Sequence, residues 1–153
     1  MATATFGRTL EVERPPDETW RTLVDVERVA GWVSIVEDVT ELEPLARYRA
    51  VLKDQVGPFK LRADLEISCP RVEEGKLIAV SASGEDRQIG SRISVEATLG
   101  LEPSDDGGTV IDVSGSYEVA GRVATLGAGT INRKATKIID QFFAAAGAAL
   151  GGR

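Results

Sequence analysis

The sequence predicts a single α+β domain over residues 1–153, in which a curved, seven-stranded antiparallel sheet surrounds one long C-terminal helix. Three observations predict this fold. Apolar and polar residues alternate in residues 5–13 and again through residues 36–119. Glycine and proline clusters interrupt the alternation at hairpin spacing. After residue 121 the apolar residues recur every three or four positions, which indicates a helix.

Residues 1–35 predict a strand, two short helices and an apolar connection. The strand covers Thr5–Glu13, where apolar and polar side chains alternate. Pro16 suits the first turn of a helix, and apolar residues recur at helical spacing from Trp20. A second helix over Asp25–Ala30 precedes the connection Trp32–Ile35, which is unusually apolar.

Six further strands are expected in the middle of the chain. They are Val36–Glu43, Arg47–Val56, Phe59–Ser68, Lys76–Ser83, Ser91–Leu101 and Thr109–Val119. In the third and fifth of these, apolar residues share one face opposite charged or hydroxyl residues. A sheet with one apolar and one polar face is typical of antiparallel strands packed on one side only.

The C-terminal segment predicts one long helix from about Gly121 to Ala149, and its glycine-rich end, residues 145–153, is expected to fray. This helix is the only large element able to cover the apolar face, so the sheet should curve around it. Many predicted inward positions are small: Ala50, Ala63, Ala79, Ser81, Ser83, Ala97 and Gly115. They leave two alternatives, a close helix–sheet contact or an internal ligand cavity.

Composition excludes several kinds of site. The chain has no histidine and one cysteine, Cys69, so His-built metal sites, Ser-His-Asp triads and internal disulfides are excluded. We expect no catalytic residue, no metal ligand and no cofactor. The net charge of −6 argues against nucleic acid as a partner. No apolar run is long enough for a membrane span and no signal peptide is visible, which predicts a cytoplasmic protein.

Three stretches resemble the carbon monoxide dehydrogenase G-subunit (CoxG) family of the START/SRPBCC helix-grip superfamily. They are Pro15–Trp20, Val56–Lys60, and Gly108–Val110 followed by Val119–Gly127. Trp32–Ile35 stands where that family has an Ile-Pro-Gly turn. The resemblance implies the helix-grip fold, a cavity for a hydrophobic molecule, and a role beside a molybdenum hydroxylase of the CO dehydrogenase type, in assembly or in electron or quinone handling.

Candidate ligand-binding residues come from the predicted inward faces and the apolar connection. They are Trp32, Tyr48, Leu52, Asp54, Leu61, Ala63, Ile93, Val95, Val113, Tyr117, Ile131, Ala135 and Ile138. Asp54 either orients a polar ligand group or lies at a solvated rim near Gly57. Tyr117 either bonds a ligand through its hydroxyl or serves as core. Trp32, with its loop, is a candidate for the cavity mouth.

Three functions remain open from the residues alone. The first is non-enzymatic binding of a lipid-like, aromatic or quinone ligand, which the mainly apolar inward set favours. The second is an enzyme of the polyketide cyclase/dehydratase kind, and the third is an assembly or interaction protein with a vestigial cavity. Arg122, Arg133, Lys134 and Lys137 form a basic helix face, which is either simply solvated or a docking surface. The candidate partners are therefore a hydrophobic small molecule, a redox enzyme and an anionic membrane surface, the last at the membrane periphery.

Overall fold

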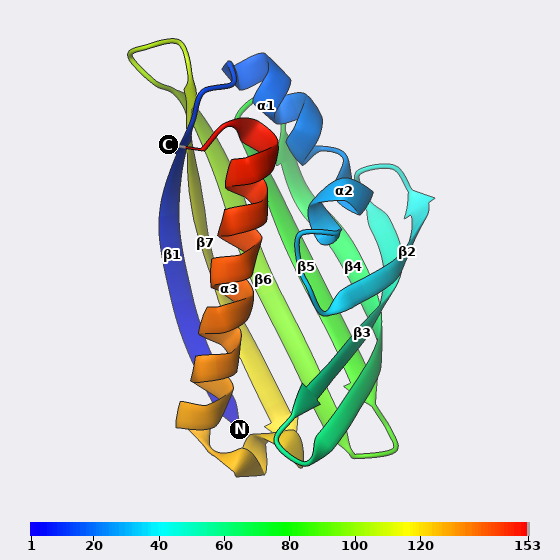
Figure 1. Ribbon diagram of the computed structural model, residues 1–153. Helices are drawn as coiled ribbons and strands as arrows, with labels where there is room; N and C mark the ends of the chain where they lie inside the picture. Colours follow the sequence, from blue (N-terminus) through cyan, green and yellow to red (C-terminus); the bar gives the residue numbers. More distant parts are fainter. Residues whose placement is uncertain (153) are drawn as a thin grey trace.

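Seven antiparallel strands form one sheet in the order β1-β7-β6-β5-β4-β3-β2, and the long helix α3 lies along its concave face (Figure 1). The computed structural model describes residues 1–152. Its elements are β1 (Ala2–Val12), α1 (Pro16–Leu23), α2 (Val26–Ala30), β2 (Val36–Glu43), β3 (Arg47–Val56), β4 (Phe59–Glu73), β5 (Leu77–Asp86), β6 (Ser91–Pro103), β7 (Thr109–Gly121), the 3-10 helix η1 (Val123–Leu126) and α3 (Ala128–Leu150). The predicted order of elements is confirmed.

Several strands are longer than the sequence predicts, and β4 and β5 continue past the proline and the glycine that were expected to end them. β4 continues past Pro70 to Glu73, because the β4–β5 register shifts between Ser68 and Arg71, and a bulge there accommodates the proline. β5 passes through Gly84 instead of ending before it. A Cβ at Gly84 would lie 2.7 Å from a methyl carbon of Leu65, so glycine permits the close approach of this side chain.

The inward face of β5 is the reverse of the prediction. Ala79, Ser81 and Ser83 were expected to point at the helix, but Ile78, Val80 and Ala82 do so, while Ser81 and Ser83 line hollows on the outer face. The pairing with β6 determines this, because Val80 lies opposite the inward-facing Ala97. Both faces of β5 carry small residues, so alternation alone did not distinguish them.

The long helix begins later than predicted. Gly121 and Gly127 have φ angles of 91° and 92°, which a continuous right-handed helix does not allow. The chain between them forms η1, and α3 begins at Ala128. Gly121 is also packed against the β5–β6 turn, where an added Cβ would lie 2.0 Å from the Gly90 carbonyl oxygen.

The expectation that residues 145–153 fray is wrong for the residues that the structure describes; Arg153 lies outside them. α3 stays helical to Leu150, whose side chain is completely buried. The Glu13 backbone N–H donates to the Gly151 carbonyl at 2.8 Å, and Gly152 forms a bridge with Val12. Gly151 ends the helix in the left-handed conformation. Burial and backbone pairing with β1 thus hold this end of the helix.

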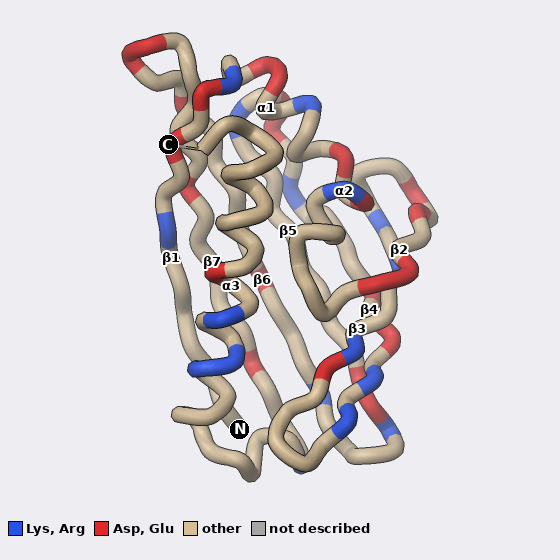
Figure 2. Tube along the Cα trace, in the orientation of Figure 1, with Lys and Arg blue, Asp and Glu red and all other residues tan. Residues whose placement is uncertain are grey.

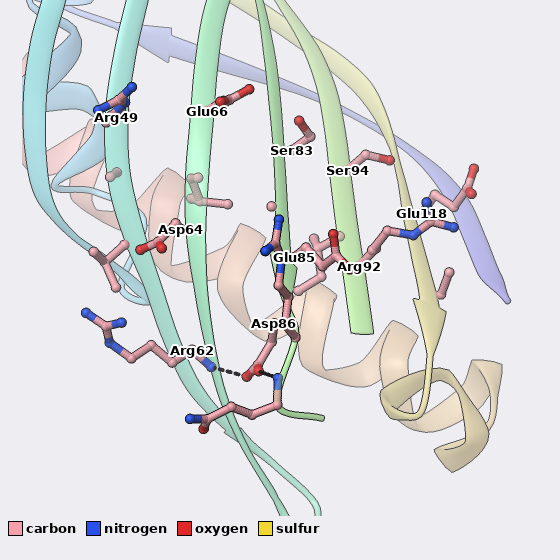
Figure 3. Close-up of a pocket in the computed structure, with 18 of the residues that line it drawn as sticks. Arg49, Arg62, Asp64, Glu66, Ser83, Glu85, Asp86, Arg92, Ser94 and Glu118 are labelled. Carbon is pink, nitrogen blue, oxygen red and sulfur yellow. Dashed lines mark hydrogen bonds between the residues drawn. The ribbon is translucent and has the colours of Figure 1, made fainter. Parts of the chain in front are cut away.

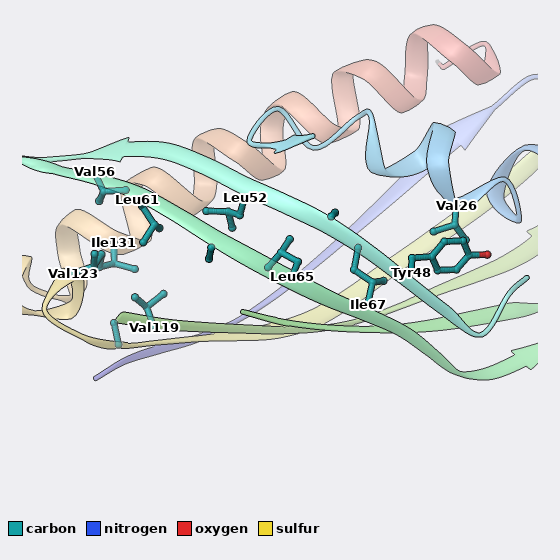
Figure 4. Close-up of a cluster of buried hydrophobic side chains, with 13 residues drawn as sticks. Val26, Tyr48, Leu52, Val56, Leu61, Leu65, Ile67, Val119, Val123 and Ile131 are labelled. Carbon is teal, nitrogen blue, oxygen red and sulfur yellow. The ribbon is translucent and has the colours of Figure 1, made fainter. Parts of the chain in front are cut away.

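The core consists of two clusters rather than one. The β3–β4 cluster follows β3 and β4 and reaches η1 and the start of α3 (Figure 4). Its buried members are Ala2, Val26, Tyr48, Ala50, Leu52, Val56, Leu61, Ala63, Leu65, Ile67, Val119, Val123 and Ile131. The β6–β7 cluster consists of Val12, Leu23, Ile78, Leu99, Leu101, Ile111, Val113 and Leu150. Part of the concave face lies between the two.

Candidate functional site

The middle of the concave face keeps accessible apolar surface. Two rows of inward side chains cross β1, β7, β6 and β5 there, and every member is only partly buried. The rows are Tyr117, Val95 and Ala82 with Ala4, and Gly115, Ala97 and Val80 with Phe6. On one side of them Leu99 and Val113 are buried, and on the other side Val119 is buried. The accessible apolar surface is therefore central, flanked by packed core.

Helix α3 faces this region with a partly covered stripe. Ile131, Ala146 and Leu150 are buried, whereas Ala135, Ile138 and Phe142 between them are only partly buried. Among the strands, the α3 backbone approaches β1 most closely. A helix fully packed on the sheet would bury the whole stripe. The uncovered part of the stripe is the part that a bound apolar molecule would contact.

The structure divides the predicted ligand-binding residues into three groups. Tyr48, Leu52, Leu61, Ala63 and Ile131 are buried in the β3–β4 cluster, and Val113 is buried in the β6–β7 cluster. The accessible group is partly buried and consists of Ile93, Val95, Tyr117, Ala135 and Ile138. Asp54 and Trp32 form the third group, because each contacts α3 from the edge of the region between α3 and the sheet. Whether any of these residues contacts a ligand stays a prediction.

Most of the small residues that were expected to face inward do not add accessible surface between α3 and the sheet. Ala50 and Ala63 are buried in the β3–β4 cluster. Above Gly115, the Phe6 ring occupies the space, since an added Cβ would lie 2.7 Å from the Phe6 Cζ. Ala97 contributes to the accessible surface as expected, and Val80, Ala82 and the partly uncovered α3 stripe contribute the rest.

Asp54 points inward and forms an ion pair with α3. Its Oδ1 lies 2.9 Å from the Nζ of Lys134, and the exposed fractions of the two side chains are 12% and 30%. The same oxygen accepts a hydrogen bond from the Gln55 backbone N–H at 2.8 Å. The solvated-rim interpretation of Asp54 is thus replaced by a sheet–helix contact. Lys134, predicted as part of an exposed basic face, is partly buried instead.

Tyr117 makes the second polar contact between sheet and helix. Its hydroxyl donates a hydrogen bond to the side-chain carbonyl oxygen of Asn132 on α3. Burial raises the pKa of Tyr117 above its usual value, so the phenol stays protonated at neutral pH and acts as a donor. Sequence analysis did not single out Asn132; its position beside Ile131 of the apolar stripe was the available signal.

Tyr48 is a structural residue in this arrangement. Its hydroxyl accepts a hydrogen bond from the Leu45 backbone N–H at 2.7 Å. Burial raises the pKa of Tyr48, and the Leu45 bond opposes this shift. Leu45 has a φ angle of 53°, an uncommon conformation for this residue type. The tyrosine therefore stabilises the tight β2–β3 turn from inside the β3–β4 cluster.

The connection that contains Trp32 lies against the C-terminal half of α3. The Trp32 ring meets the Phe142 ring edge-on at a centroid distance of 5.8 Å. The Ser34 hydroxyl donates to Gln141 Oε1 at 2.7 Å. Val33 and Ile35 of the same connection are partly buried. The loop thus closes one side of the helix–sheet space, and its role as a mouth stays a prediction.

A separate hollow of about 1250 Å³ lies on the outer face of the sheet, across β3 to β7 (Figure 3). Ser83 and Ser94 are small residues at its centre, and Arg49, Glu66 and Arg92 rise around them. The buried carboxylate of Asp86 shapes its lower end by accepting hydrogen bonds from backbone N–H groups of Arg62, Gln88 and Ile89. This hollow is open and polar, and it is distinct from the apolar concave face.

The described residues 1–152 contain no cluster of three or more histidine, cysteine or acidic side chains placed to hold a metal ion. Burial raises the pKa of the Cys69 thiol, which disfavours its reactive thiolate form. Within the same range, none of the helices combines the length and apolarity needed to cross a bilayer. The chemistry available at the concave face is therefore apolar contact supplemented by the two polar pairs.

Comparison with known proteins agrees with the architecture. The family described as the carbon monoxide dehydrogenase G subunit (CoxG) matches residues 9–151. No curated protein matches the chain. A conserved protein from Geobacillus kaustophilus superposes with a TM-score of 0.79 at 21% identity, covering 94% of this chain and 92% of that one.

Two further solved structures share the fold. A START superfamily protein from Mycobacterium smegmatis has a TM-score of 0.70 at 12% identity, with 96% of this chain and 97% of that chain covered. A protein from Rhizobium leguminosarum has a TM-score of 0.64 at 14% identity, with 94% of each chain covered. At such low identities these similarities show the helix-grip fold alone, and they confirm the fold class predicted from the sequence.

Proposed function

The chain belongs to the CoxG family, that of the carbon monoxide dehydrogenase G subunit, and on this premise we propose that it binds a hydrophobic small molecule between α3 and the concave face of the sheet. The observation that supports this proposal most is the pair of partly buried inward rows between two packed clusters. Apolar surface left accessible inside a fold is what a lipid-like, aromatic or quinone ligand would cover.

Binding is favoured over catalysis by the chemistry of the concave face. The titratable side chains that reach it are few, and Asp54 is already paired with Lys134 while Tyr117 already donates to Asn132. A cyclase or dehydratase needs an acid or base free to exchange a proton with its substrate. We therefore place the polyketide cyclase-like function second. An assembly role with a vestigial cavity is the third candidate.

The family description links the chain to carbon monoxide dehydrogenase, so a redox enzyme is the proposed protein partner. An anionic membrane surface is the alternative destination for an apolar ligand. The basic residues of α3 are the candidate contact for anionic lipid, as proposed from the sequence.

The test of ligand binding is native mass spectrometry of the protein purified gently from its host, followed by solvent extraction and Nile red titration. We expect added mass from an extractable apolar compound, or saturable Nile red fluorescence once that compound is removed. A protein that carries no added mass and gives no saturable Nile red signal would overturn the proposal. Capture of a redox enzyme by such an empty protein would favour the assembly role.

The proposed mouth has its own test. A Trp20→Phe variant leaves Trp32 as the only tryptophan, since the chain has two. Because Trp32 packs on Phe142 beside the helix–sheet space, its emission should shift when Nile red saturates the protein. The reciprocal Trp32→Phe variant is the control, because Trp20 belongs to α1. An unchanged Trp32 emission at saturation would remove this residue from the site.

A further inference from the structure

One of the two accessible rows is interrupted over β7 by the ring of Phe6. Phe6 is an inward residue of β1 and lies opposite Gly115 on β7, which in turn lies opposite Ala97 on β6. A Cβ added at Gly115 would lie 2.7 Å from the Phe6 Cζ and 3.1 Å from the Ala97 Cα. The Phe6 ring therefore extends from β1 across the glycine, and its tip reaches the side of β7 that faces β6.

Tyr117 occupies the matching place in the second accessible row. It lies on β7, opposite Ala4 of β1 and Val95 of β6. Its hydroxyl donates a hydrogen bond to Asn132 of α3, so the side chain spans the distance from the sheet to the helix. The side chains of Phe6 and Tyr117 thus form a wall over β7, which separates the β5–β6 part of the concave face from β1.

The two sides of this wall carry different side chains. On the β5–β6 side the partly buried inward residues are short and aliphatic: Val80, Ala82, Val95 and Ala97. On the β1 side, Arg8 pairs with Asp140 of α3, and its guanidinium carbon lies 5.5 Å from the centroid of the Phe143 ring. The β1 edge is thus already joined to α3, and the accessible apolar surface for a ligand lies over β5 and β6.

We propose that Phe6 limits how far a ligand extends across the concave face, and that it is a specificity-determining residue of the site. A ligand gains affinity with each methylene group that it buries over β5 and β6. A chain that reaches the Phe6 ring gains nothing from further growth in that direction, so the site favours a compact molecule over one with an extended chain. This inference rests on the proposed function, because it assumes that an apolar molecule binds between α3 and the sheet.

Straight-chain 4-alkylphenols, from methyl to octyl, test this limit in competition with Nile red. Their phenol ring is constant, so only the length of the apolar chain changes along the series. In the wild type we expect each buried methylene to lower the displacing concentration about fourfold, up to a chain length at which the gain stops. Phe6→Ala removes the ring, so chains just beyond that length should again gain about fourfold per methylene.

Two further variants assign the limit to Phe6. Phe6→Leu keeps an apolar side chain of intermediate size, so it should move the limit less than Phe6→Ala does, and it carries the test if the alanine variant does not fold. Leu10→Ala is the matched control on the same inward face of β1. Leu10 is partly buried and lies beyond the row of buried Leu99 and Val113, so its truncation should leave the limit unchanged.

The outcomes separate this inference from the proposed function. No saturable Nile red binding by the wild type would overturn the proposed function itself. Nile red binding with no length limit up to octyl, or with a limit that neither Phe6 variant moves, would overturn the role of Phe6 while ligand binding stands. An equal change of the limit in Leu10→Ala would indicate a general loosening of β1, and it would overturn the assignment to Phe6 as well.

Discussion

The two halves of α3 are held to the sheet by different chemistry. The C-terminal half buries Ala146 and Leu150, and its end pairs with β1 through the backbone. Its one ion pair with the sheet among the described residues, Asp140 with Arg8 of β1, is largely exposed. The N-terminal half buries Ile131 and otherwise relies on two polar side-chain pairs, to Asp54 and to Tyr117. Burial holds the C-terminal half as part of the core, whereas the N-terminal half depends more on polar side-chain contacts.

Charge follows the same division of the molecule (Figure 2). The three segments 55–62, 86–94 and 119–139 meet at the end where η1 and the start of α3 lie, and their only acid is the buried Asp86. At the opposite end, the turn residues include acidic pairs such as Glu73-Glu74 and Asp105-Asp106. The N-terminal half of α3 thus lies at the basic end of the protein.

The largest expected effect comes from a substitution in the buried C-terminal half of α3. Leu150→Ala removes a completely buried side chain from the β6–β7 cluster, and we expect a loss of about 2–5 kcal/mol in the free energy of unfolding. Chemical denaturation measures it. Leu42→Ala, at an exposed leucine of β2, is the control and should change stability little. A loss below about 1 kcal/mol at Leu150 would contradict the view that burial holds this end.

The second effect concerns the accessible surface between the clusters. Ala82→Phe places a ring over the accessible rows, and we expect Nile red affinity to fall by at least about tenfold, which is ~1.4 kcal/mol. Ser83→Phe is the matched control, because Ser83 is the next residue of β5 and faces the outer hollow. If both variants bind Nile red like the wild type, the dye does not occupy the concave face.

The sequence predicted the architecture well, because alternation and turn residues determine an antiparallel sheet with one apolar face. It failed where local pattern and tertiary contact disagree. β5 has small residues on both faces, so only pairing with β6 decides that Ala82, and not Ser83, points inward. Apolar Ala145–Leu150 looked like a frayed end because its partner, the end of β1, is more than a hundred residues away.

The polar residues of the candidate site were predictable on the sheet and not on the helix. Alternation placed Asp54 and Tyr117 on inward faces correctly. Asn132 and Lys134 pair with these two residues from the polar edges of the α3 stripe. Both residues border the apolar stripe of α3, and only the neighbouring strands β7 and β3 decide that they are covered, so the sequence alone left Lys134 on the exposed basic face.

The third effect tests whether the basic end contacts lipid. Arg133→Glu/Lys137→Glu reverses two exposed cations of α3, and each is worth about 1 kcal/mol toward an anionic bilayer at low salt. We expect co-sedimentation of the wild type with phosphatidylserine-containing vesicles, weakened in the variant and by salt. Arg28→Glu/Lys76→Glu makes the same charge change at the acidic end and should have a smaller effect. Equal loss in both variants would indicate net charge alone, and absence of wild-type binding would exclude this surface.

The smallest expected effect is the coupling energy of the Asp54–Lys134 pair, compared with that of an ordinary surface ion pair. Single and double substitutions Asp54→Asn and Lys134→Met form a double-mutant cycle for the sheet–helix pair. The exposed pair Lys53–Glu37, at 2.8 Å with side chains about half exposed, is the matched control. Ion pairs at exposed sites couple by about 0.2–1 kcal/mol, and we expect the Asp54–Lys134 pair near the upper end of this range because Asp54 is less solvated. A coupling energy no larger than that of Lys53–Glu37, measured by urea denaturation, would show that the pair does not help to hold α3. The N-terminal half would then depend on Ile131 and the Tyr117–Asn132 bond alone.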